Sequence, residues 1–273
     1  MASDIVLEAL DVLDFNSNYT SIKDLPQNWS VTVDEWPLMS QPWSMLAITA
    51  VYLVFVLQLG PRVMACRSPF KLRTLLMLYN GVLVVFSLWW ILKAIFELRL
   101  SSKLSCQSRN VANDQENYRM NSLVWYYLMS KFVELLDTVF FVLRKKQTQV
   151  SFLHVYHHTN MVIFTWAFLK YVRGDQILMI GCVNSAVHAV MYSYYFLAAL
   201  GPKFQRLLWF KPYITWIQMV QFVFLICYLG QLLVFGCDTP RRFTQFAVVN
   251  TLSFLILFVN FYHKTYNRKK LKQ

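Results

Sequence analysis

Residues 150–166, VSFLHVYHHTNMVIFTW, place three histidines within an apolar run that is long enough to continue across a bilayer. Residues three and four positions apart share one face of a helix, so His154, His157 and His158 are expected to point toward the same place. An ionisable side chain inside a membrane span is costly, which makes each of them a functional candidate. We therefore interpret this stretch as the reactive centre of the chain.

The composition of the rest of the chain predicts a membrane protein. Of its 273 residues, 57% are hydrophobic and 15% are charged, which is too apolar for a soluble domain of this length. A formal net charge of +12 would suggest nucleic acid as the partner of a soluble protein. Here the basic residues lie in short connections and a tail between apolar runs, so we predict a polytopic membrane protein without a nucleic-acid partner.

Seven apolar segments are long enough for membrane helices, since crossing a bilayer takes about 20 residues. They cover 43–59, 74–96, 123–143, 150–169, 176–199, 209–235 and 243–262, and helix breakers such as Gly60-Pro61 and Gly201-Pro202 separate them. The predicted fold is all-α, with seven transmembrane helices in one domain over 43–263. A polar segment, 1–42, precedes this domain, and a basic tail, 264–273, follows it.

The charge of the connections predicts the orientation. Lys and Arg collect after the first, third, fifth and seventh segments, whereas acidic residues collect on the other side. Cytosolic connections are the basic ones, so the amino terminus is expected in the lumen and the carboxyl terminus in the cytosol. In that orientation Asn18 and Asn28, each in an Asn-X-Ser/Thr sequon, become glycosylation acceptors. Cys106 and Cys237 then share an oxidising compartment, and we predict a disulfide between them, with two unrelated free thiols as the alternative.

Polar residues within the segments are expected at one depth, roughly 8 to 20 Å from the cytosolic surface by the helical rise. Besides the histidines of 150–166 they are Lys131, Glu134, Asp137, Asn160, Asn184, His188, Tyr192, Tyr194, Tyr195, Gln218 and Gln221. We expect these side chains to converge on one cavity. Structural interpretations stay open: the glutamines could join helices, Lys131 and Glu134 could form a buried ion pair, and the tyrosines could form an interfacial belt.

Two chemistries fit clustered histidines. In the first, the imidazoles bind a metal, as in the histidine boxes of membrane desaturases and hydroxylases. A di-iron centre held by histidine takes about eight ligands and the chain has 5 His, although a single zinc with three His ligands and Glu134 as base stays open. In the second, an imidazole attacks a thioester and carries the acyl group without a metal. Asp137 or Glu134 would then set the tautomer, and the oxyanion would be stabilised by amides such as Gln218, Gln221, Asn160 or Asn184.

Four motifs together resemble one family. KFVELLDT at 131–138, HVYHH at 154–158, NSAVHAVMYSYY at 184–195 and TWIQMVQ at 215–221 closely resemble, in order and separation, the motifs of the very-long-chain fatty acid elongases, the condensing enzymes of the endoplasmic reticulum. The resemblance covers the second to seventh segments. It implies that these helices form a six-helix barrel of two inverted repeats around a narrow acyl tunnel, with the first helix outside. It also implies a disulfide between a cysteine after the second helix and one after the sixth, as in Cys106 and Cys237.

The resemblance further implies an acyltransferase of the endoplasmic reticulum membrane, a very-long-chain 3-oxoacyl-CoA synthase. Such enzymes condense a long-chain acyl-CoA with malonyl-CoA and release CO2 and CoA. As a hypothesis, His157 attacks the acyl thioester, His188 assists proton transfer, and His154 and His158 complete the site. Lys131, Glu134 and Asp137 lie behind them.

CoA is strongly anionic, so its phosphates are expected at basic residues on the cytosolic face. The candidates are Lys145, Lys146, Lys203, Lys264 and Arg268. No metal or cofactor is expected beyond the CoA thioester substrates. Membrane lipid, other enzymes of the elongation cycle and a second copy of the chain are the candidate partners. A metal-dependent desaturase or hydroxylase that uses the histidine cluster is the alternative function.

Overall fold

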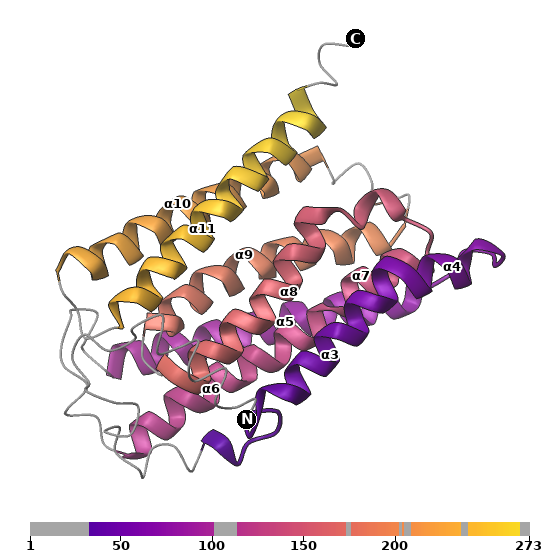
Figure 1. Ribbon diagram of the computed structural model, residues 1–273. Helices are drawn as coiled ribbons and strands as arrows, with labels where there is room; N and C mark the ends of the chain where they lie inside the picture. Colours follow the sequence, from indigo (N-terminus) through magenta and orange to yellow (C-terminus); the bar gives the residue numbers. More distant parts are fainter. Residues whose placement is uncertain are drawn as a thin grey trace.

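The computed structural model of the protein describes residues 33–100, 114–172, 176–201, 204, 209–235 and 240–267, and all regular structure within these ranges is helical (Figure 1). Six residues singled out above lie outside the described residues: Asn18, Asn28, Cys106, Lys203, Cys237 and Arg268. The glycosylation sites, the disulfide and two of the phosphate contacts therefore stay predictions.

Long helices follow one another in the order of the predicted segments. The first, α3 (Pro42–Val54), passes through a π-helical turn, Phe55–Leu59, into α4 (Gly60–Ala65). The chain continues with α5 (Arg73–Leu100), α6 (Asp114–Glu134), α7 (Leu136–Leu143), α8 (Phe152–Ala167), α9 (Gln176–Ala199), α10 (Lys211–Val234) and α11 (Arg241–Tyr262). Further π-helical turns, Phe168–Val172 and His263–Asn267, extend α8 and α11.

Five of the described helical stretches are long and apolar enough to cross a membrane: Pro42–Ala65, Arg73–Leu98, Gln176–Ala199, Lys211–Val234 and Arg241–Tyr266. They correspond to the segments predicted at 43–59, 74–96, 176–199, 209–235 and 243–262, so the chain is a multi-pass helical membrane protein. The segments predicted at 123–143 and 150–169 do not meet the same measure of length and apolarity. The reason is that α6 is polar in its first turns and carries buried charges, while α8 has 16 residues before its π-helical turn.

The structure corrects two predicted helix boundaries. Gly60-Pro61 does not end the first helical stretch. Pro61 lies in the first turn of α4, where the N–H that proline lacks would have no acceptor within that helix. The predicted segment 123–143 is not one helix, because it begins at Asp114 and is interrupted at Leu135. The Leu135 N–H donates to the Phe132 carbonyl at 3.3 Å, three residues back, so the helix tightens just beyond Glu134.

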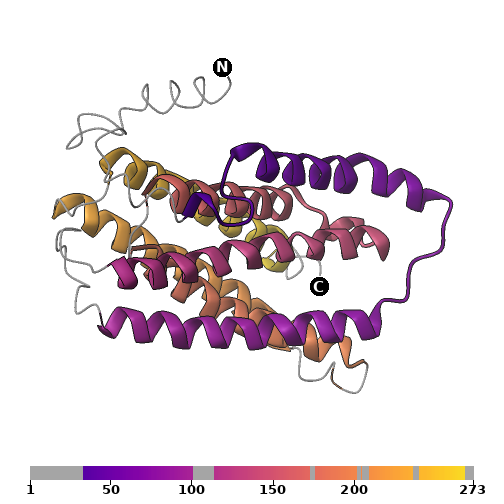
Figure 2. The same cartoon turned by 90° about the horizontal axis from the view of Figure 1, so that it is seen from below.

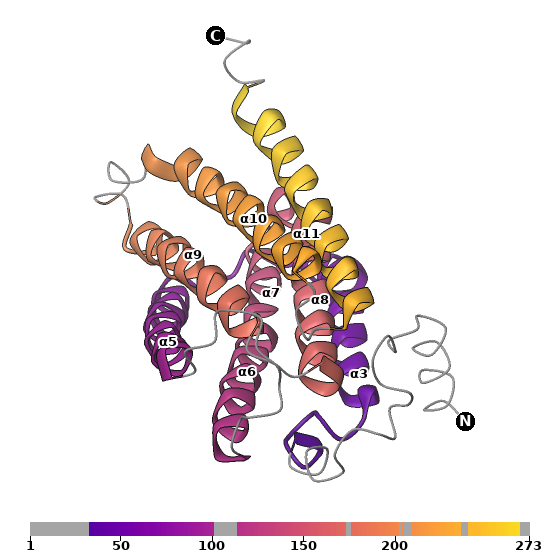
Figure 3. The same ribbon diagram turned by 90° about the vertical axis from the view of Figure 1, so that its left-hand side faces the viewer.

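The helices pack in pairs. Helix α5 runs along α9, α10 runs along α11, and α6 lies beside α8 (Figure 3). Helix α3 lies against α8 and α4 against α7, and Figure 2 shows α3 and α5 on opposite sides of the bundle. At one end of the α5/α9 pair, the Arg73 guanidinium donates to the carbonyls of Ala199 and Leu200, where α9 ends. This contact satisfies helix-end carbonyls with a positive charge and fixes α5 against α9.

Trp90 of α5 is the largest side chain that is fully buried in the main core. Its indole N–H donates to the Leu123 carbonyl of α6 at 2.8 Å, and its ring lies 5.1 Å from that of Tyr127. Gly181 of α9 faces the other edge of the indole, and a Cβ atom there would lie 2.6 Å from Trp90. Trp90 therefore sets the spacing between α5, α6 and α9, the helices that supply most of the polar network described next.

Candidate active site

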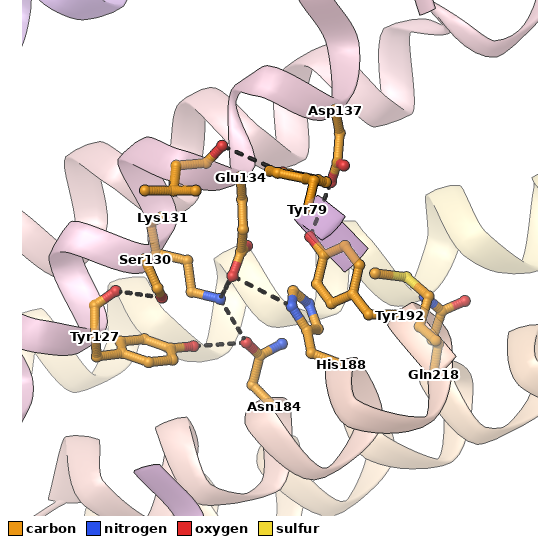
Figure 4. A network of polar contacts seen from close by, with 12 residues as sticks. Tyr79, Tyr127, Ser130, Lys131, Glu134, Asp137, Asn184, His188, Tyr192 and Gln218 are labelled. Carbon is orange, nitrogen blue, oxygen red and sulfur yellow. Dashed lines mark hydrogen bonds and ion pairs between the residues drawn. The ribbon is translucent and has the colours of Figure 1, made fainter. Parts of the chain in front are cut away.

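A buried network of polar side chains joins α6 to α9 (Figure 4). Lys131 Nζ donates to both carboxylate oxygens of Glu134, at 2.8 and 3.0 Å, and to Asn184 Oδ1 at 3.0 Å. Glu134 Oε1 also lies 3.4 Å from His188 Nδ1. The side chains of Lys131 and Glu134 are 2% and 5% exposed, so each buried charge is stabilised by the opposite charge of the other residue. The network therefore holds a carboxylate against an imidazole away from water.

Tyr127 completes the Lys131 end of this network. Its hydroxyl donates to Asn184 Oδ1 at 2.6 Å, and Lys131 Nζ lies 4.4 Å from the centroid of its ring, which is a cation–π distance. Because both donors approach the oxygen of Asn184, its amide nitrogen is turned to the side of His188 (Figure 4). The sequence analysis missed Tyr127, although its spacing of four residues from Lys131 is a usable signal.

Asp137 lies beyond Glu134 and joins α7 to α9. The hydroxyl of Tyr192 donates to Asp137 Oδ2 at 2.8 Å, and both residues are buried. The Tyr79 ring of α5 meets the Tyr192 ring edge-on at 6.4 Å, and its hydroxyl donates to the Val133 carbonyl at 3.2 Å. Asp137 is thus held by α9 while α5 covers the contact, and Tyr79 is a second residue that the sequence analysis missed.

Helix α3 reaches the same region through a third tyrosine. The hydroxyls of Tyr52 and Thr138 lie 2.8 Å apart, and both are buried. Thr138 directly follows Asp137 in α7, so this hydrogen bond brings the first helix next to the acidic residues. Tyr52 was also missed, because a lone tyrosine in an apolar segment carries no distinctive pattern.

The three histidines of α8 lie together. Ser151 caps the helix by accepting a hydrogen bond from the His154 N–H at 3.3 Å, which places His154 in the first turn. The ring of His158 lies 4.3 Å from that of His154 and 5.5 Å from that of His157. Helix α8 packs against α6, the helix that carries Lys131 and Glu134. The α8 histidines and the Glu134 network are therefore parts of one region.

The predicted amide side chains of α8 and α10 have different hydrogen-bond partners. Asn160 pairs with Asn250 of α11, which the sequence analysis did not single out. Gln218 Nε2 donates to the Met191 sulfur at 3.6 Å, a weak partner, and Gln221 is buried one turn further along α10. Through Met191, which precedes Tyr192 in α9, Gln218 joins α10 to the helix that carries His188 (Figure 4).

The remaining predicted residues are the tyrosines near the end of α9 and the lysines Lys145, Lys146 and Lys264. The ring of Tyr195 packs against those of Tyr192 and Tyr194, at 6.2 and 5.7 Å. Lys145 donates to the Ala65 carbonyl at the end of α4 at 3.2 Å, which leaves two of its three ammonium protons for other acceptors. Lys146 and Lys264 are exposed. In the part of the chain that the structure describes, these three lysines do not contact the polar network.

Metal binding is one of the two chemistries that clustered histidines can support. Within the described ranges, no three His, Cys, Asp or Glu side chains are grouped as ligands of one ion. The geometry instead offers a carboxylate next to Nδ1 of His188. A carboxylate at Nδ1 favours the tautomer with its proton there, which leaves the lone pair on Nε2 for proton or acyl transfer.

Comparison with known proteins identifies one family of similar sequences. The sequence model of the family described as ELO: GNS1/SUR4 family matches residues 37–273, which include the whole polar network. A very long chain fatty acid elongase 4 of Mus musculus is 42% identical over 247 residues, which are 89% of this chain and 78% of that protein. A very long chain fatty acid elongase of Aedes aegypti is 42% identical over 245 residues, 88% of this chain and 67% of that protein. Very long chain fatty acid elongase 7 of Drosophila melanogaster is 39% identical over 254 residues, 92% of this chain and 77% of that protein.

Proposed function

The chain belongs to the ELO family, also described as the GNS1/SUR4 family, and we propose that it is a condensing enzyme of fatty acid elongation. In this reaction a long-chain acyl-CoA is joined to malonyl-CoA, giving a 3-oxoacyl-CoA, CO2 and CoA. Beside the names of the relatives, the observation that carries the proposal is the buried contact of Glu134 with His188, next to the histidines of α8. Such a pair supplies a polarised imidazole inside an apolar helical bundle, the surroundings that an acyl chain would need.

The proposed fold is a barrel of six helices around an acyl tunnel, with α3 outside it. Helix α6 with α7, and α8 with its π-helical turn, would be the further two membrane spans. The stretch Phe152–Val172 supports this, because its 21 residues extend about 30 Å at the helical rise, enough for a hydrocarbon core. The position of α3 against α8, opposite α5, is consistent with a helix that stands outside the barrel (Figure 2).

The proposed chemistry begins with His157. A lone pair on its imidazole attacks the acyl thioester, a C–N bond forms, the C–S bond breaks, and CoA leaves as a thiolate. His188 takes the ring proton of the acylated imidazole and passes it to the thiolate, so that a neutral acyl imidazole and CoA remain. Malonyl-CoA then loses its carboxylate as CO2, and the carbon of the resulting enolate attacks the acyl carbon. The C–N bond to His157 breaks, and the imidazole regains its ring proton from water.

The other polar residues would support these steps. Glu134, held by Lys131, sets the tautomer of His188. Amide groups of Asn184, Gln218 and Gln221 would stabilise the negative oxygen of the thioester adduct or of the enolate. His154 and His158 would complete the wall around His157. Neither step uses a metal or a cofactor other than the CoA substrates.

The proposed setting is the membrane of the endoplasmic reticulum, with the amino terminus lumenal and the carboxyl terminus cytosolic. The CoA phosphates would lie on the cytosolic side near Lys145, Lys146, Lys203, Lys264 and Arg268. The lumenal side would carry glycans at Asn18 and Asn28 and a Cys106 to Cys237 disulfide. The charge of the connections and the oxidising nature of the lumen support these assignments.

The test is product analysis with the purified protein. Wild type in detergent, given malonyl-CoA and acyl-CoAs of several chain lengths, is expected to give a 3-oxoacyl-CoA two carbons longer and an equal amount of CO2. His157→Ala and His188→Ala should lose at least about 100-fold in turnover, while His263→Ala, on the exposed turn after α11, should retain it. A product of unchanged length that is desaturated or hydroxylated would reject the condensing activity and favour the metal-dependent alternative.

A further inference from the structure

Asn250 of α11 makes a directional contact with the histidine helix. Its Nδ2 donates to Asn160 Oδ1 at 2.9 Å, and Asn160 Nδ2 donates back to Asn250 Oδ1 at 3.1 Å. The Tyr156 hydroxyl donates to the same Asn250 oxygen at 3.4 Å. Tyr156 and Asn160 flank His157 in α8, one residue before it and three after it. Asn250 therefore contacts both sides of the proposed nucleophile along the chain.

Phe254 lies one turn beyond Asn250 and contacts His157 itself. Its ring centroid is 5.2 Å from that of His157, in an edge-to-face arrangement, and 5.3 Å from that of Tyr156. Phe222 of α10 stacks behind it at 5.9 Å. Phe254 is 3% exposed, so it has little room to move. The His157 ring is thus held between His158 on its own helix and Phe254 on α11.

The amide pair matters because the aromatic part of the α8–α11 contact gives little directional constraint. Phe164 packs against Phe243 and Phe246 of α11 at 5.1 and 6.3 Å, and such stacked rings tolerate sliding and rotation. A reciprocal pair of N–H···O bonds does not, because both bonds keep their geometry in only one register of the two helices. The chemistry of His157 depends on this register, since a displacement of about 1 Å can lower a rate about 100-fold.

We infer that Asn250 and Phe254 are positioning residues, which fix the ring of His157 by joining α8 to α11. The inference rests on the proposed function only for the role of His157, whereas the placement rests on the contacts above. Asn160 then serves first as the partner of Asn250 rather than as an oxyanion donor. The pair uses one N–H of each amide, so each amide keeps one further N–H as a donor.

The test uses variants on both helices and a matched control. Asn250→Leu and Asn160→Leu each remove the amide pair at similar volume, and Phe254→Leu removes the ring beside His157. Ser253→Ala is the control, because the Ser253 hydroxyl only donates to the Val249 carbonyl within α11 at 2.9 Å. Thermal unfolding in detergent shows which variants are folded. If Asn250→Leu does not fold, Phe254→Leu still tests the positioning of His157.

The first measurement does not require turnover. Diethyl pyrocarbonate acylates accessible imidazole nitrogens, and mass spectrometry gives the labelling of His157 relative to His188. Asn250→Leu, Asn160→Leu and Phe254→Leu should each change this ratio at least threefold, and Ser253→Ala should not. The Asn160→Leu/Asn250→Leu double variant should match Asn250→Leu alone, because that single variant already removes the amide pair. An unchanged ratio, or additive effects of the asparagine variants, would overturn the inference.

The second measurement separates the inference from the proposed function. In elongation assays, Asn250→Leu and Phe254→Leu should lower kcat at least tenfold with the KM for malonyl-CoA within twofold of wild type. An equal loss in Ser253→Ala, or a change confined to KM, would contradict a positioning role. A wild type that elongates nothing would reject the proposed function, while the labelling ratio would still decide whether α11 positions His157.

Discussion

His188 Nδ1 lies 3.4 Å from Glu134 Oε1, while the same carboxylate receives two hydrogen bonds from Lys131. The lysine thus compensates the charge of Glu134 and leaves it in place beside the imidazole. A buried imidazole with an oriented carboxylate is a common arrangement for proton transfer and nucleophilic attack. The structural role of Glu134 and the chemical role proposed for it can therefore be measured separately.

Glu134→Gln should lower both stability and turnover. It leaves the Lys131 ammonium buried without its partner, which costs about 3–5 kcal/mol in the free energy of unfolding. It also removes the carboxylate from His188, with an expected loss of about 100-fold in turnover. Adding Lys131→Met should recover much of the melting temperature but not the turnover. Recovery of turnover in the double variant would show that Glu134 acts only through folding.

Gly181→Val should destabilise the protein. The new Cβ atom would meet the buried Trp90 indole, which cannot move because its N–H is bonded to α6, so we expect a loss of about 1–3 kcal/mol. Thermal unfolding in detergent measures it. Gly230→Ala on α10 is the matched control, because nothing lies within 4 Å of its Cβ position, and it should unfold at or above the wild-type temperature. Equal melting temperatures for both variants would contradict close packing at Trp90.

Tyr192→Phe should weaken the contact between α7 and α9. The buried Asp137 carboxylate loses the donor at 2.8 Å, and a buried acceptor without its partner costs about 1–3 kcal/mol. Tyr126→Phe, on an exposed tyrosine of α6, should leave unfolding unchanged. Urea or thermal unfolding of both variants checks this, and a Tyr192→Phe variant as stable as Tyr126→Phe would mean that Asp137 does not depend on this donor.

Metal chelators should leave elongation intact, since neither step of the proposed chemistry uses an ion. The measurement is product formation after prolonged exposure of the purified protein to EDTA and to a phenanthroline. Restoration of a lost activity by added zinc or iron would instead support the metal-dependent alternative. A soluble metalloenzyme treated in parallel shows that the chelators act under the same detergent conditions.

The helical spacing of single segments predicted part of the site. Lys131 and Glu134 are three residues apart, and the structure pairs them; the histidines of α8 share a face and lie together. Asn184 and His188 are four apart on α9, and both reach the Lys131–Glu134 pair. These residues could be found because a polar side chain in an apolar segment is conspicuous and helix periodicity fixes its direction.

The partners between helices could not be predicted in this way. Tyr52 and Tyr79 look like ordinary aromatic residues of membrane segments, and only packing places their hydroxyls next to Thr138 and Val133. Asn250 was visible as an amide in the last segment, but its pairing with Asn160 depends on the register of α8 and α11. The break at Leu135 has no Gly or Pro beside it, so the sequence gives no local signal for it.

The hydrogen bond between Tyr52 and Thr138 has a bearing on how far the protein can be shortened. A truncated chain that starts at Arg73 would keep every histidine and every acidic residue of the network. It would, however, lose the hydrogen bond between Tyr52 and Thr138, the residue next to Asp137. The leading helix therefore supports the acidic end of the polar network, and we expect a chain without it to be less stable.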